Sequence, residues 1–105
     1  MLTLTIKKKW FDMIKCGFKK EEYREIKPYY DRLFREYISH LHIITPMGAY
    51  QHYDPFYVIF RNGYKKNSPK IECKCVLSKG TGVPEWGAEP NKEYYILKIL
   101  GVWEV

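Results

Sequence analysis

The chain has 105 residues, a length typical of one domain. Its composition, 46% apolar and 17% aromatic, provides enough core-forming side chains to exclude a disordered chain. Its net charge of +6 favours an anionic partner such as RNA, a nucleotide or another phosphate-bearing ligand. No apolar run approaches the roughly 18 residues of a membrane span, so we expect no membrane association through spanning helices.

Cysteine usage and the N-terminus bear on the compartment. Cys16, Cys73 and Cys75 form an odd set, and the last two are one residue apart in a strand-like run, unlike a secreted disulfide framework. Residues 1–6 are followed at once by three lysines, so the N-terminus lacks a signal-peptide core. We therefore expect a cytoplasmic protein with reduced thiols.

The first quarter of the chain predicts a strand, a short helix and a second strand. Residues 2–6 alternate between apolar and polar, as in a half-buried strand. Residues 8–16 carry apolar side chains at helical spacing, and Gly17 follows where helices commonly end in a left-handed residue. Residues 19–26 have no apolar stripe of helical period, so we expect a strand, although Glu, Lys and Arg also favour helices.

The middle of the chain predicts an amphipathic helix and a β-hairpin. Pro28 suits the first turn of a helix of about three turns, which would lie across the sheet and close one end of the core. Its apolar face comprises Tyr30, Leu33, Phe34, Tyr37, Ile38 and Leu41. Residues 56–61 and 70–77 are strand-like around the turn signal Asn62-Gly63. The second of these strands presents Ile71, Cys73, Cys75 and Leu77 on one face.

The C-terminal part predicts a long loop and a central strand. Residues 78–92 are rich in glycine and proline, and a loop of this length is often functional. Residues 93–105 are apolar on both faces, which indicates a long strand or a strand pair inside the structure, bent or bulged at Gly101. We therefore expect residues 1–105 to form one mainly β domain of the α+β class, a partly closed barrel of five or six strands with two flanking helices.

The densest group of reactive side chains lies in the predicted strand after Gly17. Two-residue alternation places Glu22 and Arg24 on one side together with Lys20, and Lys19 on the other side unless a bulge redirects it. An acid, a base and a guanidinium that converge could bind a phosphate or a polarised carbonyl, because arginine is a two-pronged donor that a carboxylate can orient. The alternative is a solvated edge strand whose charges deter aggregation.

Metal binding and thiol chemistry have weaker signals. Cys73 and Cys75 with His40 and His42 lack the paired spacing of a structural zinc site, so we favour buried thiols without a metal. Cys16 lies at a helix end, where the dipole opposes a thiolate. We expect neither a metal nor another cofactor.

Several loop residues are further candidates. His52 could be a general base at neutral pH, although an ordinary loop histidine is the simpler interpretation. Tyr50, Tyr64 and Trp86 could stack on nucleobases. Most other aromatic side chains are needed for the core.

The segment around the first glycine resembles a known family. Gly17, Lys19, Glu22 and Arg24 match the pattern G-x-K-x-x-E-x-R of the ASCH domain family. The similarity continues through Lys27-Pro28-Tyr29-Tyr30, Arg32, Arg61-Asn62-Gly63-Tyr64 and Glu85-Trp86-Gly87-Ala88-Glu89-Pro90, which look like a bacterial and phage branch of that family. The resemblance implies a PUA-like β-barrel with two flanking helices, and an RNA-related role in which the motif lines a cleft.

Some members of that family are enzymes, namely an amidohydrolase of acetylated cytidine and a reported ribonuclease. In the amidohydrolase branch, a Lys and a Thr of this segment and a later Glu carry catalysis. Lys19 matches that Lys, whereas Glu22 stands where the Thr would be, so the hydroxyl nucleophile is missing. The later Glu corresponds to either Glu72 or Glu85.

Three hypotheses follow. In the first, a binding module holds RNA or a nucleotide: Lys19 and Arg24 contact phosphate, Glu22 orients Arg24 or accepts from a base edge, and aromatic side chains such as Tyr64 and Trp86 stack on bases. In the second, a small hydrolase uses Lys19 as base or charge stabiliser and Glu22 as general base for water. The third is a protein-binding accessory domain.

Overall fold

The computed structural model describes residues 2–38 and 55–105. Five strands, three α-helices and one short 3₁₀ helix make up this part of the chain. In chain order they are β1 (Leu2–Thr5), α1 (Lys8–Lys15), β2 (Glu21–Glu25), α2 (Pro28–Leu33), α3 (Arg35–Ile38), β3 (Phe56–Arg61), β4 (Lys70–Thr81), the 3₁₀ helix η2 (Pro84–Trp86) and β5 (Glu93–Glu104).

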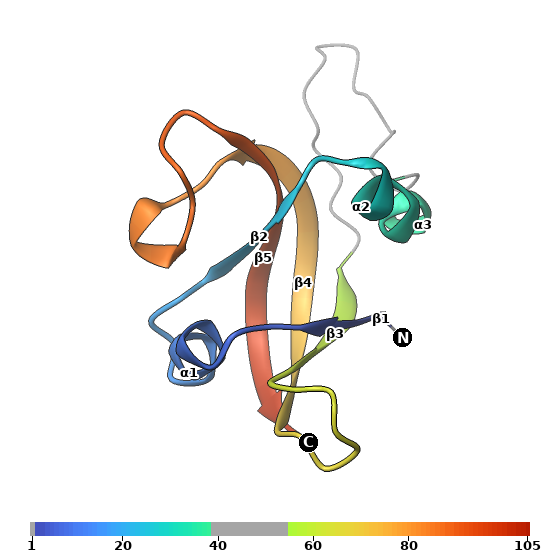
Figure 1. The fold of residues 1–105 in the computed structure, drawn as a ribbon, viewed down its shortest axis with the longest axis vertical. Coiled ribbons are helices and arrows are strands. Elements are labelled where there is room, and N and C mark those ends of the chain that lie inside the picture. The colour runs from blue at the N-terminus through green and yellow to red at the C-terminus, as the bar shows by residue number, and fades with distance from the viewer. Residues whose placement is uncertain (1, 39–54) are drawn as a thin grey trace.

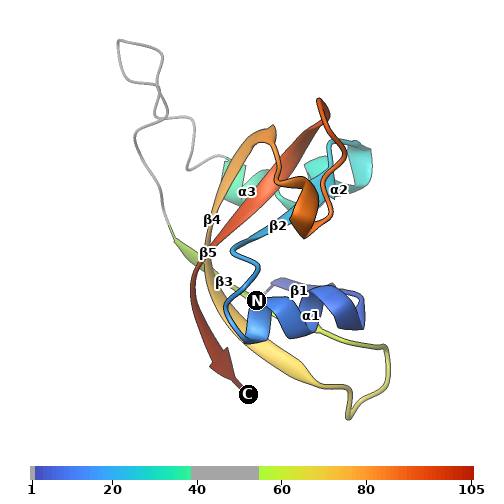
Figure 2. The same ribbon diagram turned by 90° about the vertical axis from the view of Figure 1, so that its left-hand side faces the viewer.

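The strands form one mixed sheet in the order β1-β3-β4-β5-β2. β1 pairs with β3 in parallel, and the other neighbours are antiparallel. The sheet curls into a half-barrel, with α1 and the α2–α3 pair toward opposite ends of it (Figures 1 and 2). The mainly β, partly closed barrel predicted from the sequence is confirmed, with three α-helices in the described residues rather than two.

The edge strands β1 and β2 do not pair with each other, so the barrel is open between them. β1 is only four residues long and β2 five, whereas β4 and β5 each have twelve. Backbone donors and acceptors on the open edges of β1 and β2 are therefore left without a strand partner. This opening is called the seam below.

Strand β5 is an inner strand of the sheet, in agreement with its two apolar faces. It lies between β4 and β2, and its consecutive residues from Tyr94 to Leu97 are all buried. Lys74 pairs with Gly101 and Cys75 with Ile99, which leaves Leu100 as an extra residue in a bulge beside the predicted bend. β4 continues to Thr81, so the loop predicted over residues 78–92 is shorter than expected.

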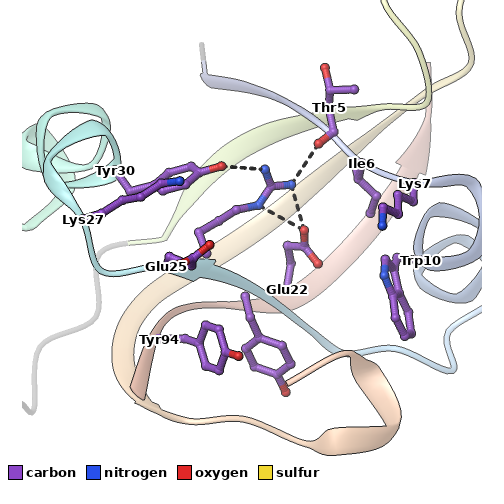
Figure 3. A pocket seen from close by; sticks show the side chains of 11 residues that line it. Thr5, Ile6, Lys7, Trp10, Glu22, Glu25, Lys27, Tyr30 and Tyr94 are labelled. Carbon is purple, nitrogen blue, oxygen red and sulfur yellow. Dashed lines mark hydrogen bonds and ion pairs between the residues drawn. The ribbon is translucent and has the colours of Figure 1, made fainter. Parts of the chain in front are cut away.

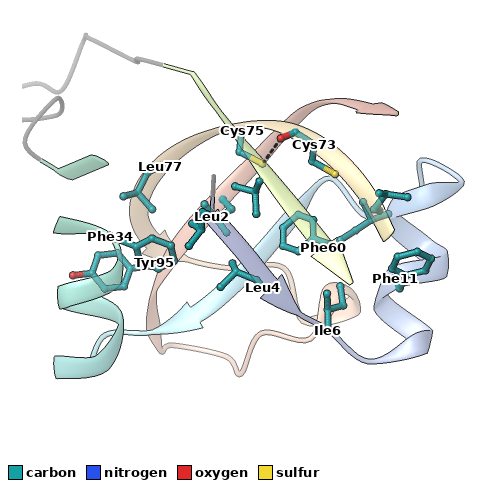
Figure 4. Packing of buried hydrophobic residues seen from close by; sticks show 14 residues of the cluster. Leu2, Leu4, Ile6, Phe11, Phe34, Phe60, Cys73, Cys75, Leu77 and Tyr95 are labelled. Atoms are coloured by element: carbon teal, nitrogen blue, oxygen red, sulfur yellow. Dashed lines mark hydrogen bonds between the residues drawn. The ribbon is translucent and has the colours of Figure 1, made fainter. Parts of the chain in front are cut away.

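The core fills the inner side of the curled sheet (Figure 4). β4 contributes the predicted row of Ile71, Cys73, Cys75 and Leu77, which are at most 2% exposed. Phe11 from α1 packs at one end and Phe34, between α2 and α3, at the other (Figure 4). Burial of an aromatic side chain of this size stabilises the fold by about 1.5–3 kcal/mol.

The single helix predicted from Pro28 to Leu41 is wrong within the described residues. α2 ends at Leu33, the backbone of Phe34 departs from helical geometry, and α3 begins at Arg35. The Phe34 ring is fully buried, 5.1 Å from the Tyr95 ring and 5.8 Å from the Tyr30 ring between centroids. The helix is thus interrupted at Phe34, where the ring packs into the core, and the regular apolar spacing of the sequence does not reveal this interruption. Leu41 lies outside the described residues.

Some predictions concern the rest of the chain. His40, His42, Tyr50 and His52 lie outside the described residues. No helix in the described ranges is both long and apolar enough to cross a bilayer.

The Tyr95 hydroxyl gives a test of the packing between β5 and α2. It donates to Asp31 Oδ1 at 2.5 Å, and burial, followed by this hydrogen bond and the Asp31 charge, raises the pKa of Tyr95 to about 12. A phenol with a raised pKa in the folded state stabilises the fold fully below pH ~10 and loses this contribution as the pH rises toward 12. We expect Tyr95→Phe to lower the free energy of unfolding by about 1–2 kcal/mol at neutral pH.

Urea unfolding at neutral pH measures the loss of unfolding free energy in Tyr95→Phe, and the same experiment at pH ~11 measures how this loss depends on pH. Tyr29→Phe, at a half-exposed tyrosine on α2, is the matched control and should leave both values unchanged. Equal pH dependence in the wild type and in Tyr95→Phe would contradict the assignment to Tyr95.

Candidate functional site

A glycine turn after α1 sets the position of Lys19. Gly17 has a φ of +85°, and the amides of Phe18 and Lys19 both donate to the carbonyl of Met13, at 2.9 and 3.0 Å. This left-handed turn favours glycine. It leaves Phe18 73% exposed and turns Lys19 inward, where it is only 1% exposed.

The placement expected for Lys20 is therefore wrong, and Lys19 follows the alternative in which the backbone beside Gly17 redirects it. Lys20 is exposed, and Lys19, rather than Lys20, lies on the same side as Glu22. The reason is that β2 begins only at Glu21. Lys19 and Lys20 lie between the glycine turn and the first residue of β2, so the two-residue period of the strand does not fix the direction of the Lys19 side chain.

Lys19 is held by several partners. Its Nζ lies 3.3 Å from Glu22 Oε1 and donates to the carbonyl oxygen of Trp86. It also lies 4.9 Å from the ring centroids of both Trp10 and Tyr23. Burial lowers the pKa of Lys19, and the nearby Glu22 charge opposes that shift. Trp86 thus contributes to this site through its backbone.

Glu22 and Arg24 lie on the same side of β2, as their spacing predicted. Arg24 Nε and Nη2 donate to Glu22 Oε2 at 3.1 and 2.8 Å. Nη2 also donates to the carbonyl of Thr5 at 3.0 Å, and Nη1 donates to the hydroxyl of Tyr30 at 3.2 Å. These contacts leave little of the five-donor guanidinium for another partner.

The three charged residues form a single buried network, here called the seam network: Lys19, Glu22 and Arg24. Arg24 connects β2 with the end of β1 through Thr5 and with α2 through Tyr30 (Figure 3). Burial acts to lower the pKa of Arg24, but the charge of Glu22 and the hydrogen bonds to Tyr30 and Glu22 together outweigh it, and the pKa is raised. The seam network therefore spans the opening where strand pairing is absent.

A pocket of about 420 Å³ lies over this network (Figure 3). Its aromatic lining consists of Trp10, Tyr23, Tyr30 and Tyr94. Its charged lining consists of Lys7, Glu22, Arg24, Glu25 and Lys27, and Thr5 and Ile6 complete the wall. Lys19 is not part of the lining, because it contacts the Glu22 carboxylate from the buried side.

Other predicted residues do not join this pocket. Tyr64 is 86% exposed in the loop between β3 and β4, and the Trp86 side chain does not line the pocket. Glu72 alternates with the buried Ile71 and Cys73, so it lies on the opposite face of the sheet. Glu85 is exposed in η2 and does not line the pocket either.

The lining residues that the sequence did not single out include Lys7, Trp10, Lys27 and Tyr30. Trp10 lies among residues 8–16, whose apolar side chains predict a helix, and Tyr30 belongs to the apolar face predicted for the second helix. Lys7 and Lys27 each directly precede a helix, at the N-cap of α1 and of α2. Their position between a predicted strand and a predicted helix is the sequence feature that could have identified them, since both junctions lie at the open edges of this barrel.

None of the three cysteines lines the pocket. All three are free, with Cys16 exposed and Cys73 and Cys75 buried. Burial, followed by the charge of Glu72, raises the pKa of Cys73 to about 12, so its thiol is protonated at neutral pH. Among the residues that the structure describes, no group of three or more His, Cys, Asp or Glu side chains could hold a metal ion.

Removal of the central carboxylate tests the seam network. Glu22→Ala leaves Lys19 and Arg24 buried without a counter-charge, so we expect a loss of about 3–5 kcal/mol in the free energy of unfolding. Glu104→Ala removes the partner of Lys15 from an exposed ion pair and should cost less than about 1 kcal/mol.

Urea unfolding of the two variants provides the comparison. If Glu22→Ala does not fold, Glu22→Gln keeps the shape and part of the hydrogen bonding, and its loss should still exceed that of Glu104→Ala. Equal losses at the buried and the exposed carboxylate would show that the network does not hold the seam.

The comparison with known proteins adds no identification. No family model, curated protein or solved structure matches this chain. The similarity of the segment from Gly17 to Arg24 to the ASCH pattern therefore stays a prediction, and the function has to be argued from the pocket and its lining.

Proposed function

We propose that the chain is an ASCH-type, PUA-like domain that binds single-stranded RNA or a nucleotide in the pocket at the seam. The observation that carries this proposal is the lining, in which aromatic rings and charged side chains surround one hollow of about 420 Å³. Small-molecule sites typically have volumes of ~300–1,000 Å³, so the hollow suits a ligand such as one nucleotide.

The chemistry of the lining supports an unpaired nucleotide. Single-stranded RNA is bound through bases that stack on aromatic side chains and through phosphates that contact basic residues. A base in a duplex is stacked on both sides and cannot enter a pocket of this kind. The net charge of +6 supports attraction of a polyanion.

The seam network has a supporting role in this proposal. Arg24 and Glu22 line the pocket and hold β1, β2 and α2 in place around it. Glu22 retains lone pairs that can accept from the amino edge of a base. Lys19 keeps the carboxylate of Glu22 oriented from the buried side.

A hydrolase of a modified nucleoside or of RNA is the second candidate. The lowered pKa of Lys19 beside Glu22 favours it, because a lysine of lowered pKa is a stronger candidate for a general base. The position of Lys19 behind Glu22, outside the pocket lining, favours binding instead.

NMR titration tests the binding site directly. On addition of a short single-stranded RNA we expect the indole N–H signal of Trp10 and the Nε–H signal of Arg24 to shift, because both side chains line the pocket. The indole signal of Trp103, which does not line it, is the internal control. No shift at micromolar protein, or shifts confined to Trp103, would refute the proposed site.

Turnover of acetylated cytidine separates the two candidates. If the domain only binds, the wild type and Lys19→Met should release product at the same background rate. Release by the wild type that is abolished in Lys19→Met, with the fold intact by circular dichroism, would identify a hydrolase.

A further inference from the structure

We propose that Lys7, rather than Lys19 or Arg24, holds the phosphate of the bound nucleotide, so that the ligand enters the pocket with its phosphate at the Lys7 end and its base and ribose toward Tyr30. This inference rests on the proposed function and gives the pocket a direction. The ligand class it names is a nucleotide unit of a single strand, bound through one phosphate.

Lys19 and Arg24 are poor phosphate ligands because most of their donors are already in use. Lys19 Nζ is shared between Glu22 and the carbonyl of Trp86, and it does not reach the lining. Arg24 donates to Glu22, Thr5 and Tyr30. A phosphate that recruited either cation would have to break buried charge-assisted hydrogen bonds, which are among the strongest in proteins.

Lys7 has the opposite character. It is exposed, it lines the pocket, and no ion pair or side-chain hydrogen bond engages it within the described part of the chain. It lies beside Ile6 and Trp10, across the pocket from Lys27 and Tyr30 (Figure 3). The neighbouring Lys8 is bound to Asp12 at 2.6 Å and does not line the pocket. Lys7 is thus a cation available to a ligand.

The opposite end of the pocket is less suited to an anion. There Lys27 has the carboxylate of Glu25 nearby in the lining, and its Nζ lies 5.5 Å from the centroid of the Tyr30 ring. Glu25 in turn lies 3.6 Å from Lys92. A phosphate at this end would meet a carboxylate, whereas a base or ribose can donate to it.

The hydroxyl of Tyr30 adds a polar group of the right kind at this end. It accepts from Arg24 Nη1, so its own proton remains available to a ligand acceptor. A nucleobase or ribose offers such acceptors. The Lys7 end of the pocket therefore suits a phosphate, and the Tyr30 end suits a base or ribose.

Salt dependence of binding tests the phosphate assignment. The probe is a short, fluorescently labelled single-stranded RNA of mixed sequence, titrated with the full chain by fluorescence anisotropy between about 50 and 200 mM salt. Lys7→Gln should weaken binding at low salt at least about fivefold, as expected for loss of one charged phosphate contact. It should also reduce the slope of log affinity against log salt by about 0.7.

Lys20→Gln is the matched control. It removes the same charge from an exposed lysine that does not line the pocket, so it should leave affinity and slope near the wild-type values. Lys27→Gln should reduce the slope less than Lys7→Gln does. Thermal unfolding of all three variants checks that the fold is retained.

The outcomes are distinguishable. If the wild type binds no RNA, the proposed function and this inference both fail. If the wild type binds but Lys7→Gln and Lys20→Gln behave alike, the phosphate is not held by Lys7, although the pocket proposal stands. If Lys27→Gln reduces the slope as much as Lys7→Gln, the single direction of binding is wrong.

Discussion

One buried carboxylate, Glu22, is the group on which the open side of the barrel depends. It accepts from Arg24 through Oε2 and lies 3.3 Å from Lys19 Nζ through Oε1, and it is only 7% exposed. A charge of this burial would cost several kcal/mol without partners. Here the charge of Glu22 is compensated by Lys19 and Arg24. Because none of the three side chains can lose its partner without a large cost, their relative positions are fixed.

The seam explains why a pocket exists at this place. In a closed barrel, neighbouring strands are joined by backbone hydrogen bonds and leave no opening. Here Arg24 reaches from β2 to the carbonyl of Thr5 at the end of β1 and to Tyr30 on α2, so a side chain spans the distance that strand pairing does not. These hydrogen bonds of Arg24 therefore fix the positions of β1, β2 and α2 around the pocket. The residue that holds the pocket walls in place, Arg24, is therefore different from an exposed lining residue such as Lys7, whose side chain remains available to a ligand.

Much of the fold was accessible from local patterns. The alternation in β1, the apolar row of β4 and the two-faced apolar run of β5 predicted these strands, because each pattern reports the burial of a regular element. The break at Phe34 was not accessible, since the spacing from Tyr30 onward is continuous and only packing against Tyr95 distinguishes that residue. The hairpin between β3 and β4 was predicted from the Asn62-Gly63 signal, and in the structure the two strands are joined by a loop from Asn62 to Pro69 rather than by a two-residue turn.

In the site, local sequence patterns are sufficient to place Glu22 and Arg24 on one side of a strand that follows a glycine turn. They do not reveal that Lys19 turns inward, that Trp86 contributes its carbonyl rather than its ring, or that Lys7 lines the same pocket. The difference lies in the distance along the chain over which each effect acts. Alternation and turn propensity act over a few residues, whereas the partners of a buried charge come from β1, α2 and the loop before β5, and these meet only when the sheet has curled.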